Sequence, residues 1–187
     1  MFEVCKWGSK LRVIAGKAKG IGLDAPIGLN TRPTLDKVRE AIFGSLQFEI
    51  PGSKCLDLFS GSGAMGIEAL SRGAAECIFV DNEKNCINAI KANLARTKLS
   101  GTVKFVSFEQ ALKSFNTEFD FIFMDPPYAS GYYDKAAQIV LEKNLLNSDG
   151  KIIAEHDGSL ENLKGFTAIK TKKYGKAYVT WFVKENV

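Results

Sequence analysis

The chain has 187 residues, with 25 basic side chains, 21 acidic ones and a single histidine, which gives a formal net charge of +4. Hydrophobic residues make up 45% and charged residues 25%, which is typical of a globular protein and excludes a disordered chain. The longest stretch without a charge, from Leu58 to Ile67, has ten residues, whereas a membrane-spanning helix needs about 20 apolar ones. The charged N-terminus resembles no signal peptide. We therefore expect a cytoplasmic protein, with one domain and no membrane segment.

We expect the first 52 residues to form an N-terminal arm. Two short apolar runs, 10–15 and 21–25, surround Gly16 and Gly20 and predict a small β-hairpin or extended segment. Helical spacing of apolar residues begins at Thr34, a good N-cap, directly after Pro33. We expect this arm to pack on a core formed by residues 53–187, in a single structural unit.

The core alternates between strands and helices. Strands are predicted at 54–59, 76–80, 103–108, 119–124 and 151–154, and helices at 64–71, 83–97, 110–115 and 132–143. Such alternation predicts an α/β fold in which helices cover both faces of a mostly parallel sheet. Two further β-rich runs, 166–174 and 176–184, meet at Gly175 and predict a terminal antiparallel hairpin. Phenylalanines at strand spacing are expected in the core: Phe105, Phe108, Phe119, Phe121 and Phe123.

A glycine-rich loop follows the first strand of the core. Gly61, Gly63 and Gly66 have the spacing G-x-G-x-x-G between a strand and a helix, where glycine permits a tight turn and close approach of a ligand. The next strand ends at Asp81, where an acid can accept hydrogen bonds from ribose hydroxyls. The alternative is that the glycines serve turn geometry alone and Asp81 is an ordinary loop acid.

The acid before this loop indicates which nucleoside cofactor would bind. Asp57 would repel the pyrophosphate of a dinucleotide, whereas it suits the sulfonium and amino groups of S-adenosylmethionine. NAD fits less well, and a P-loop is excluded because no G-K-[ST] follows the glycines. No metal is expected, because one histidine and scattered cysteines (Cys5, Cys55, Cys77 and Cys86) offer no ligand set.

The fourth predicted strand runs into Asp125, Pro126, Pro127 and Tyr128. The prolines end the strand and hold the backbone rigid at the carboxyl edge of the sheet, where open α/β folds bind ligands. Asp125 and a backbone carbonyl can accept the two N–H groups of an exocyclic amine, and Tyr128 can stack on the base. A base inside a helix would have to be flipped out or be unpaired already. The alternative is a Pro-Pro turn with a capping aspartate.

These motifs resemble class I S-adenosylmethionine-dependent methyltransferases. The glycine-loop segment 57–74 and D-P-P-Y at 125–128 carry that resemblance. Segments 12–20 and 32–43, the latter beginning R-P-T, resemble one family within the class, the bacterial 16S ribosomal RNA guanine-N2 methyltransferases. This resemblance implies a Rossmann-like, seven-stranded sheet and methyl transfer to a guanine N2 of the small-subunit rRNA.

The resemblance also implies which residues form the site. The cofactor would contact Asp57, Phe59, Gly61, Ser62, Gly63, Asp81, Asn82, Glu109 and Gln110. Residues Asp125 to Tyr128 would hold the target amine, and Arg32, Pro33 and Thr34 would lie beside it. The family often has Asp or Asn before a small residue near the adenine, whereas this chain reads Ser107-Phe108-Glu109-Gln110-Ala111.

Charge is unevenly distributed along the chain. Residues 1–20 carry five basic and one acidic side chain, residues 163–187 carry six lysines and one glutamate, and the middle carries 14 basic and 19 acidic side chains. The two basic ends can bind phosphates of 16S rRNA in a small-subunit particle, or they can merely aid solubility. Arg12 and Arg39 can each be interpreted equally well as a phosphate contact or as a solvated surface charge.

Three other functions stay open, namely a DNA adenine-N6 methyltransferase, an NAD-dependent oxidoreductase and a non-catalytic RNA-binding protein. A monomer is expected. His156 is interpreted as a structural or surface residue, because methyl transfer to an amine needs no strong base before attack.

Overall fold

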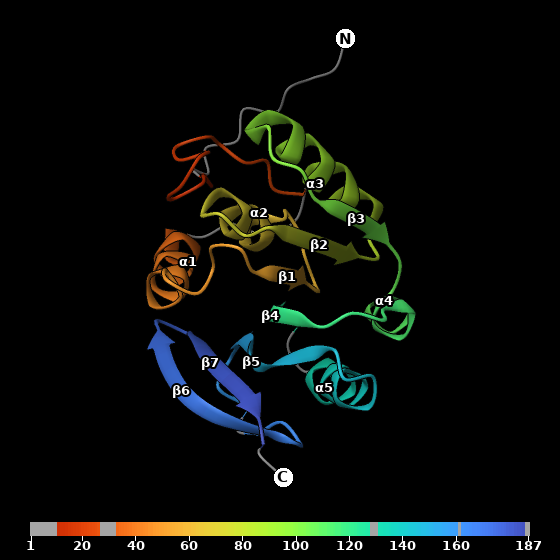
Figure 1. Cartoon of the computed structure of the whole chain (residues 1–187). Helices are drawn as coiled ribbons and strands as arrows, with labels where there is room; N and C mark the ends of the chain where they lie inside the picture. Colours follow the sequence, from red (N-terminus) through yellow and green to blue (C-terminus); the bar gives the residue numbers. More distant parts are fainter. Residues whose placement is uncertain (1–10, 27–32, 128–130, 161, 186–187) are drawn as a thin grey trace.

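The computed structural model describes residues 11–26, 33–127, 131–160 and 162–185 (Figure 1). Within these residues it has five helices, α1 (Pro33–Ser45), α2 (Ala64–Ser71), α3 (Lys84–Thr97), α4 (Phe108–Ser114) and α5 (Tyr132–Glu142). Its strands are β1 (Lys54–Asp57), β2 (Glu76–Asp81), β3 (Thr102–Phe105), β4 (Phe119–Met124), β5 (Leu146–His156), β6 (Phe166–Tyr174) and β7 (Ala177–Lys184). No helix in this part of the chain is long and apolar enough to cross a membrane.

The strands form one seven-stranded sheet in the order β3-β2-β1-β4-β5-β7-β6. β1 lies between β2 and β4 and is parallel to both, and the chain proceeds outward from β1 to one side and from β4 to the other. This reversal of strand order places a topological switch point between β1 and β4, where open α/β sheets bind ligands. β7 is antiparallel to both β5 and β6, so the predicted terminal hairpin is confirmed.

Helices cover both faces of the sheet, as predicted. Helices α1, α2 and α3 lie on one face, called here the α1 face, and α4 and α5 lie on the other (Figure 1). Side chains alternate between the two faces along each strand. On β1, for example, Cys55 packs in the core of the α1 face and Leu56 in the opposite core. Asp57 therefore belongs to the α1 face.

Residues 11–26 form a narrow hairpin on the α1 face. Backbone hydrogen bonds join Val13 to Ile21 and Leu23 to Leu11, with N to O distances of 3.0 and 2.8 Å. Leu11, Val13 and Leu23 are buried in the core beside α1, α2 and α3. The predicted hairpin is thus present in this part of the arm.

Several predicted boundaries differ from the structure, and the first strand of the core, predicted at 54–59, ends at Asp57. β3 ends at Phe105, and Ser107 begins α4 through a capping box with Gln110, so Phe108 is helical. Phe105 is 57% exposed and not in the core, because β3 is an edge strand. α1 begins at Pro33, a position that suits proline because its missing N–H would be unpaired there. β5 extends over Leu146–His156, beyond the predicted 151–154.

Candidate functional site

The glycine loop connects the carboxyl end of β1 to the start of α2. Gly61 and Gly63 have φ angles of 53° and 77°, a region that favours glycine. The backbone N–H of Gly61 donates to Asp81 Oδ2 at 2.8 Å, which ties the loop to the end of β2. Gly66 is required for close packing of α2 on β2, because a Cβ there would lie 2.3 Å from the Phe79 ring. The loop is therefore shaped by its glycines and fixed by Asp81.

Two cavities open beside this loop. The Asp81 cavity is lined by Asp81, Asn82, Glu109, Pro126 and Pro127, among others. The Asp57 cavity extends along the α1 face, and its lining includes Asp57, Ser62, Leu11, Ala25, Val38, Arg39 and Glu155. Phe59, Gly61 and Asp125 line both cavities. Asp125 therefore lies where the two cavities adjoin.

The structure brings most of the predicted site residues together around these cavities. Gly63 lines neither cavity and instead forms the N-cap of α2. Gln110 also lines neither cavity; it is exposed, and its side chain closes the capping box of α4. Tyr128 and Arg32 lie outside the described residues, and so do the side chains of Pro33 and Thr34.

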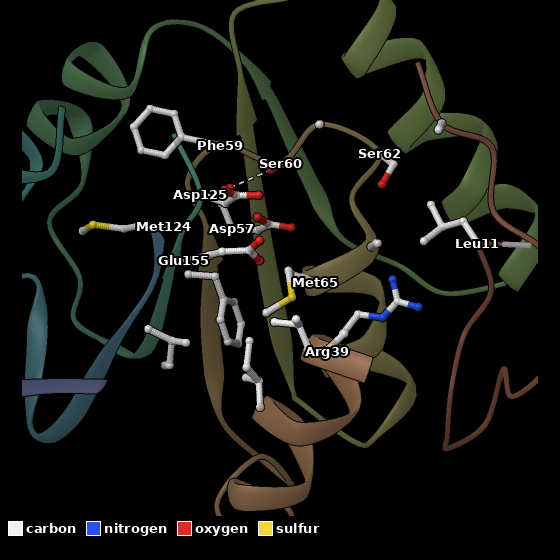
Figure 2. A pocket seen from close by; sticks show the side chains of 17 residues that line it. Leu11, Arg39, Asp57, Phe59, Ser60, Ser62, Met65, Met124, Asp125 and Glu155 are labelled. Carbon is white, nitrogen blue, oxygen red and sulfur yellow. Dashed lines mark hydrogen bonds between the residues drawn. The ribbon is translucent and has the colours of Figure 1, made fainter. Parts of the chain in front are cut away.

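Three carboxylates give the Asp57 cavity its electrostatic character. Figure 2 shows Asp57, Asp125 and Glu155 grouped on one side of it. Burial raises the pKa of Asp57 to about 7, although the N–H of Gly66 donates to its carboxylate at 2.9 Å. The pKa of Asp125 is raised well above its usual value, first because the surrounding protein displaces water and then by repulsion from Glu155 and Asp57. Burial raises the pKa of Glu155 as well.

Such a group of carboxylates favours a cationic or hydrogen-bond-donating ligand. Among the described residues, no group of three or more His, Cys, Asp or Glu has the arrangement to hold a metal ion.

Arg39 is buried and lines the Asp57 cavity, so the interpretation of it as a solvated surface charge is wrong, whereas a contact with the substrate stays a prediction. It is 3% exposed, and its Nη2 donates to the Arg12 carbonyl and, at 3.0 Å, to Asp36 Oδ1. Its Nε lies 3.8 Å from Glu68 Oε2. In Figure 2 its guanidinium points toward Leu11 and away from the three carboxylates. Arg39 thus joins the arm to α1 and α2, whereas the side chain of Arg12 is exposed.

Two buried polar residues that sequence analysis missed hold the arm beside the site. Glu68 on α2 is fully buried and accepts the backbone N–H groups of Ile14 and Ala15 at 2.8 and 3.0 Å. Asn93 on α3 is also fully buried, and its amide donates to the carbonyls of Asp24 and Ser62 at 2.8 and 2.9 Å. Asn93 therefore connects the arm to the glycine loop. The sequence feature that could have revealed both residues is a polar side chain at a helix position where the pattern calls for an apolar one.

Glu155 is the third residue that sequence analysis missed. It lies at the carboxyl end of β5, next to the strand that leads to Asp125. The sequence shows that Glu155 follows a predicted strand, but only the order of the strands shows that this strand lies beside the one that leads to Asp125.

Comparison with known proteins identifies the family. The family model described as "Conserved hypothetical protein 95" matches residues 11–183. The chain is 42% identical to "Putative rRNA methyltransferase YlbH" of Bacillus subtilis over 81% of its own length and 85% of that protein's. It is 34% identical to "Ribosomal RNA small subunit methyltransferase D" of Haemophilus influenzae over 89% and 90% of the two chains.

The fold agrees with these relatives. The solved structure "Putative methyltransferase yhhF from Escherichia coli" superposes with a TM-score of 0.84 at 28% identity, covering 94% of this chain and 98% of that one. On the extent of the family match, the chain belongs to the Conserved hypothetical protein 95 family.

Proposed function

We propose that the protein is an S-adenosylmethionine-dependent methyltransferase that acts on the exocyclic N2 of a guanine in 16S rRNA. The observation that carries the proposal is the position of Asp125, which lines both cavities at the carboxyl edge of the sheet. A cofactor with its ribose in the Asp81 cavity and its positive charge near Asp57 would meet a target base at this carboxylate. The names of the B. subtilis and H. influenzae relatives, both rRNA methyltransferases, support the substrate class.

The residues present fit the cofactor. Asp81 and Asn82 in the Asp81 cavity can accept hydrogen bonds from ribose hydroxyls. Asp57 is 4% exposed and has a pKa near 7, which marks a buried carboxylate that a cationic ligand would stabilise. S-adenosylmethionine supplies a methyl group on a positively charged sulfur, and no other chemistry is required of it.

The protein's part in the reaction is to bind and orient the amine. An exocyclic amine is a weak nucleophile because its lone pair is delocalised into the base. The Asp125 carboxylate can accept one N–H, localise that lone pair and direct it toward the cofactor. The same carboxylate can take the proton that N2 loses, since its raised pKa favours protonation. Buried Pro126, one residue further on, limits the movement of this segment.

We extend the proposal to the partner and the setting. The protein acts as a monomer in the cytoplasm on a small-subunit ribosomal particle, and the basic ends of the chain contact rRNA phosphates. The arm and α1 line the Asp57 cavity, so a large substrate bound to the arm would lie beside the reacting atoms.

Mass-spectrometric mapping of methylated nucleotides tests the proposal directly. We expect the wild-type protein, incubated with S-adenosylmethionine and small-subunit particles that lack the modification, to produce one N2-methylguanine in 16S rRNA. Asp125→Ala should lower the rate by about 100-fold or more while S-adenosylmethionine still binds. Asp149→Ala, at an exposed aspartate on β5, is the matched control and should retain the wild-type rate. Methylation of DNA alone, or N6-methyladenine as the product, would refute the proposal.

A further inference from the structure

Asp125 and Glu155 lie side by side at the ends of two neighbouring parallel strands. In the register of β4 and β5, Met124 pairs with Ala154, and Asp125 and Glu155 are the next residues along the two strands. Both side chains reach the Asp57 cavity, as Figure 2 shows. Two carboxylates therefore face one ligand site from adjacent strand ends.

The backbone of Glu155 is fixed from both sides. The Tyr133 hydroxyl on α5 donates to the carbonyl of Glu155 from the opposite face of the sheet. His156, the next residue, is 2% exposed, and its Nε2 lies 2.9 Å from Thr180 Oγ1 on β7. Among the described residues, none donates a hydrogen bond to the Glu155 carboxylate itself. The side chain thus projects from a rigid strand end with its hydrogen-bonding capacity directed at the cavity.

The chemistry of the purines shows what a second carboxylate can distinguish. Guanine presents adjacent donors at N1–H and N2–H, whereas adenine presents a donor at N6 and an acceptor lone pair at N1. One carboxylate near the target amine serves both bases equally, because both amines donate. A second carboxylate opposite N1 accepts a hydrogen bond from guanine but faces a lone pair on adenine. Enzymes that extrude a base read this same edge.

We infer that Glu155 is a specificity-determining residue, which accepts the N1–H of the target guanine while Asp125 accepts an N2–H. This inference rests on the proposed function and deepens it, since it explains why this D-P-P-Y site would take guanine rather than adenine. Repulsion between the two carboxylates in the free protein is relieved when the donors of guanine lie between them. A site that ends β5 in a neutral residue would lack this discrimination.

The base analogue 2-aminopurine separates the two contacts, because it keeps the N2 amine but has a lone pair at N1. The test uses 16S rRNA assembled by splinted ligation, in which the mapped guanine is either kept or replaced by 2-aminopurine. Wild-type protein should prefer guanine over 2-aminopurine by about 10- to 100-fold in transfer rate. Glu155→Gln can donate an N–H to the analogue's N1, so this preference should fall by about tenfold or more.

Binding gives a readout that does not depend on transfer. The fluorescence of 2-aminopurine rises when the base leaves its stack, so titration of the labelled rRNA reports entry into the site. Glu155→Gln should bind the labelled rRNA more tightly than the wild-type protein does. Asp157→Asn, which also removes one negative charge but on an exposed residue outside both cavities, should leave the preference unchanged.

The outcomes distinguish this inference from the function on which it rests. If Glu155→Gln slows transfer to both bases by the same factor, Glu155 has a structural role and the inference is wrong, although the methyltransferase proposal stands. If the wild-type protein modifies no guanine in the rRNA, the proposed function itself fails. If the preference for guanine falls while Asp157→Asn keeps it, the assignment of Glu155 is supported.

Discussion

At the scale of single residues, Asp57 couples the site to pH. Its pKa of about 7 arises from burial, and repulsion from Asp81 adds to it. A cationic ligand favours the ionised form, so binding releases a proton wherever Asp57 is protonated in the free protein. Affinity for S-adenosylmethionine should therefore be full above pH 7 and fall by up to tenfold for each pH unit below it.

Calorimetric titrations between pH 5.5 and 8.5 check this prediction. Asp57→Asn should bind the cofactor more weakly than the wild-type protein at pH 8, with a much flatter pH profile. Asp149→Asn is the control and should follow the wild-type profile. An unchanged pH dependence in Asp57→Asn would show that another group titrates, with Asp125 the first to examine because its pKa is also raised.

The Asp57 carboxylate also affects the stability of the fold, because its pKa is higher in the folded protein than in the unfolded chain. The folded protein holds the proton on Asp57 more tightly than the unfolded chain, whose pKa lies near 3.8. Its contribution to the free energy of unfolding therefore decreases as pH rises from about 4 to about 7, and the loss is complete above 7. Asp57→Asn should be more stable than the wild-type protein by about 4 kcal/mol at pH 8 and equally stable at pH 4, as measured by urea unfolding.

Sequence analysis identified those site residues that belong to a short motif of neighbouring residues. The glycine loop, Asp57, Asp81 and Asp125 follow strands at positions where only the neighbouring residues are needed for the interpretation. Glu155, Glu68 and Asn93 were missed because their partners lie far along the chain, for instance Asp24, which is 69 residues from Asn93. Contacts of this kind follow from the three-dimensional arrangement and have no local signature.

At the scale of elements, the arm is held by buried polar contacts as well as by apolar packing. Glu68 accepts two backbone N–H groups of the arm and a bond from Arg72 at 2.7 Å. Gly16, with φ of 82°, passes so close to α2 that a Cβ would lie 1.9 Å from the Ser71 carbonyl oxygen. The arm therefore fits one position on α2, and this position places Leu11 at the Asp57 cavity.

Removing the charge of Glu68 should loosen this attachment. Glu68→Gln leaves Arg39 and Arg72 without their buried counter-charge, which should lower the free energy of unfolding by about 3 kcal/mol. Chemical denaturation at pH 7 measures the change, and hydrogen exchange should show faster exchange at Ile14 and Ala15. Glu40→Gln, on the exposed side of α1, is the matched control, and equal effects of the two substitutions would contradict the prediction.

Elements with a strong periodic pattern were predicted well, and their ends less so. β4 and α2 have the predicted bounds because turn residues bracket them on both sides. The error at β3 arose because Phe108 suits a strand by composition, whereas the capping box of Ser107 and Gln110 starts a helix there. β5 was predicted too short because Asp149 and Gly150 resemble a turn, although the strand continues through them.

At the scale of the whole molecule, the two basic ends lie differently relative to the site. β5 ends at the carboxyl edge beside the cavities, and Glu155, Val179 and Lys172 are cross-strand neighbours on β5, β7 and β6. Exposed Lys176 lies in the turn between β6 and β7 at the same edge. Lys17, in contrast, donates its backbone N–H to Ser71 at the far end of α2, which begins at the glycine loop.

Net charge alone cannot make this distinction, because both ends are basic in sequence. The order of the strands, which local patterns do not supply, brings the terminal hairpin to the site and leaves the tip of the arm at the opposite edge. Electrostatic attraction of rRNA toward the reacting atoms should therefore depend more on the hairpin lysines than on the arm tip.

A pair of matched charge reversals tests this difference. Lys172→Glu with Lys176→Glu should weaken binding to 16S rRNA by at least about tenfold at moderate salt, and lower the slope of log affinity against log salt concentration by about 2. Lys17→Glu with Lys19→Glu makes the same change in net charge at exposed residues of the arm tip and should have a much smaller effect. Affinity for S-adenosylmethionine should stay at the wild-type value in both variants, since none of the four lysines lines a cavity. Equal losses of rRNA affinity would mean that net charge, rather than its placement beside the site, determines binding.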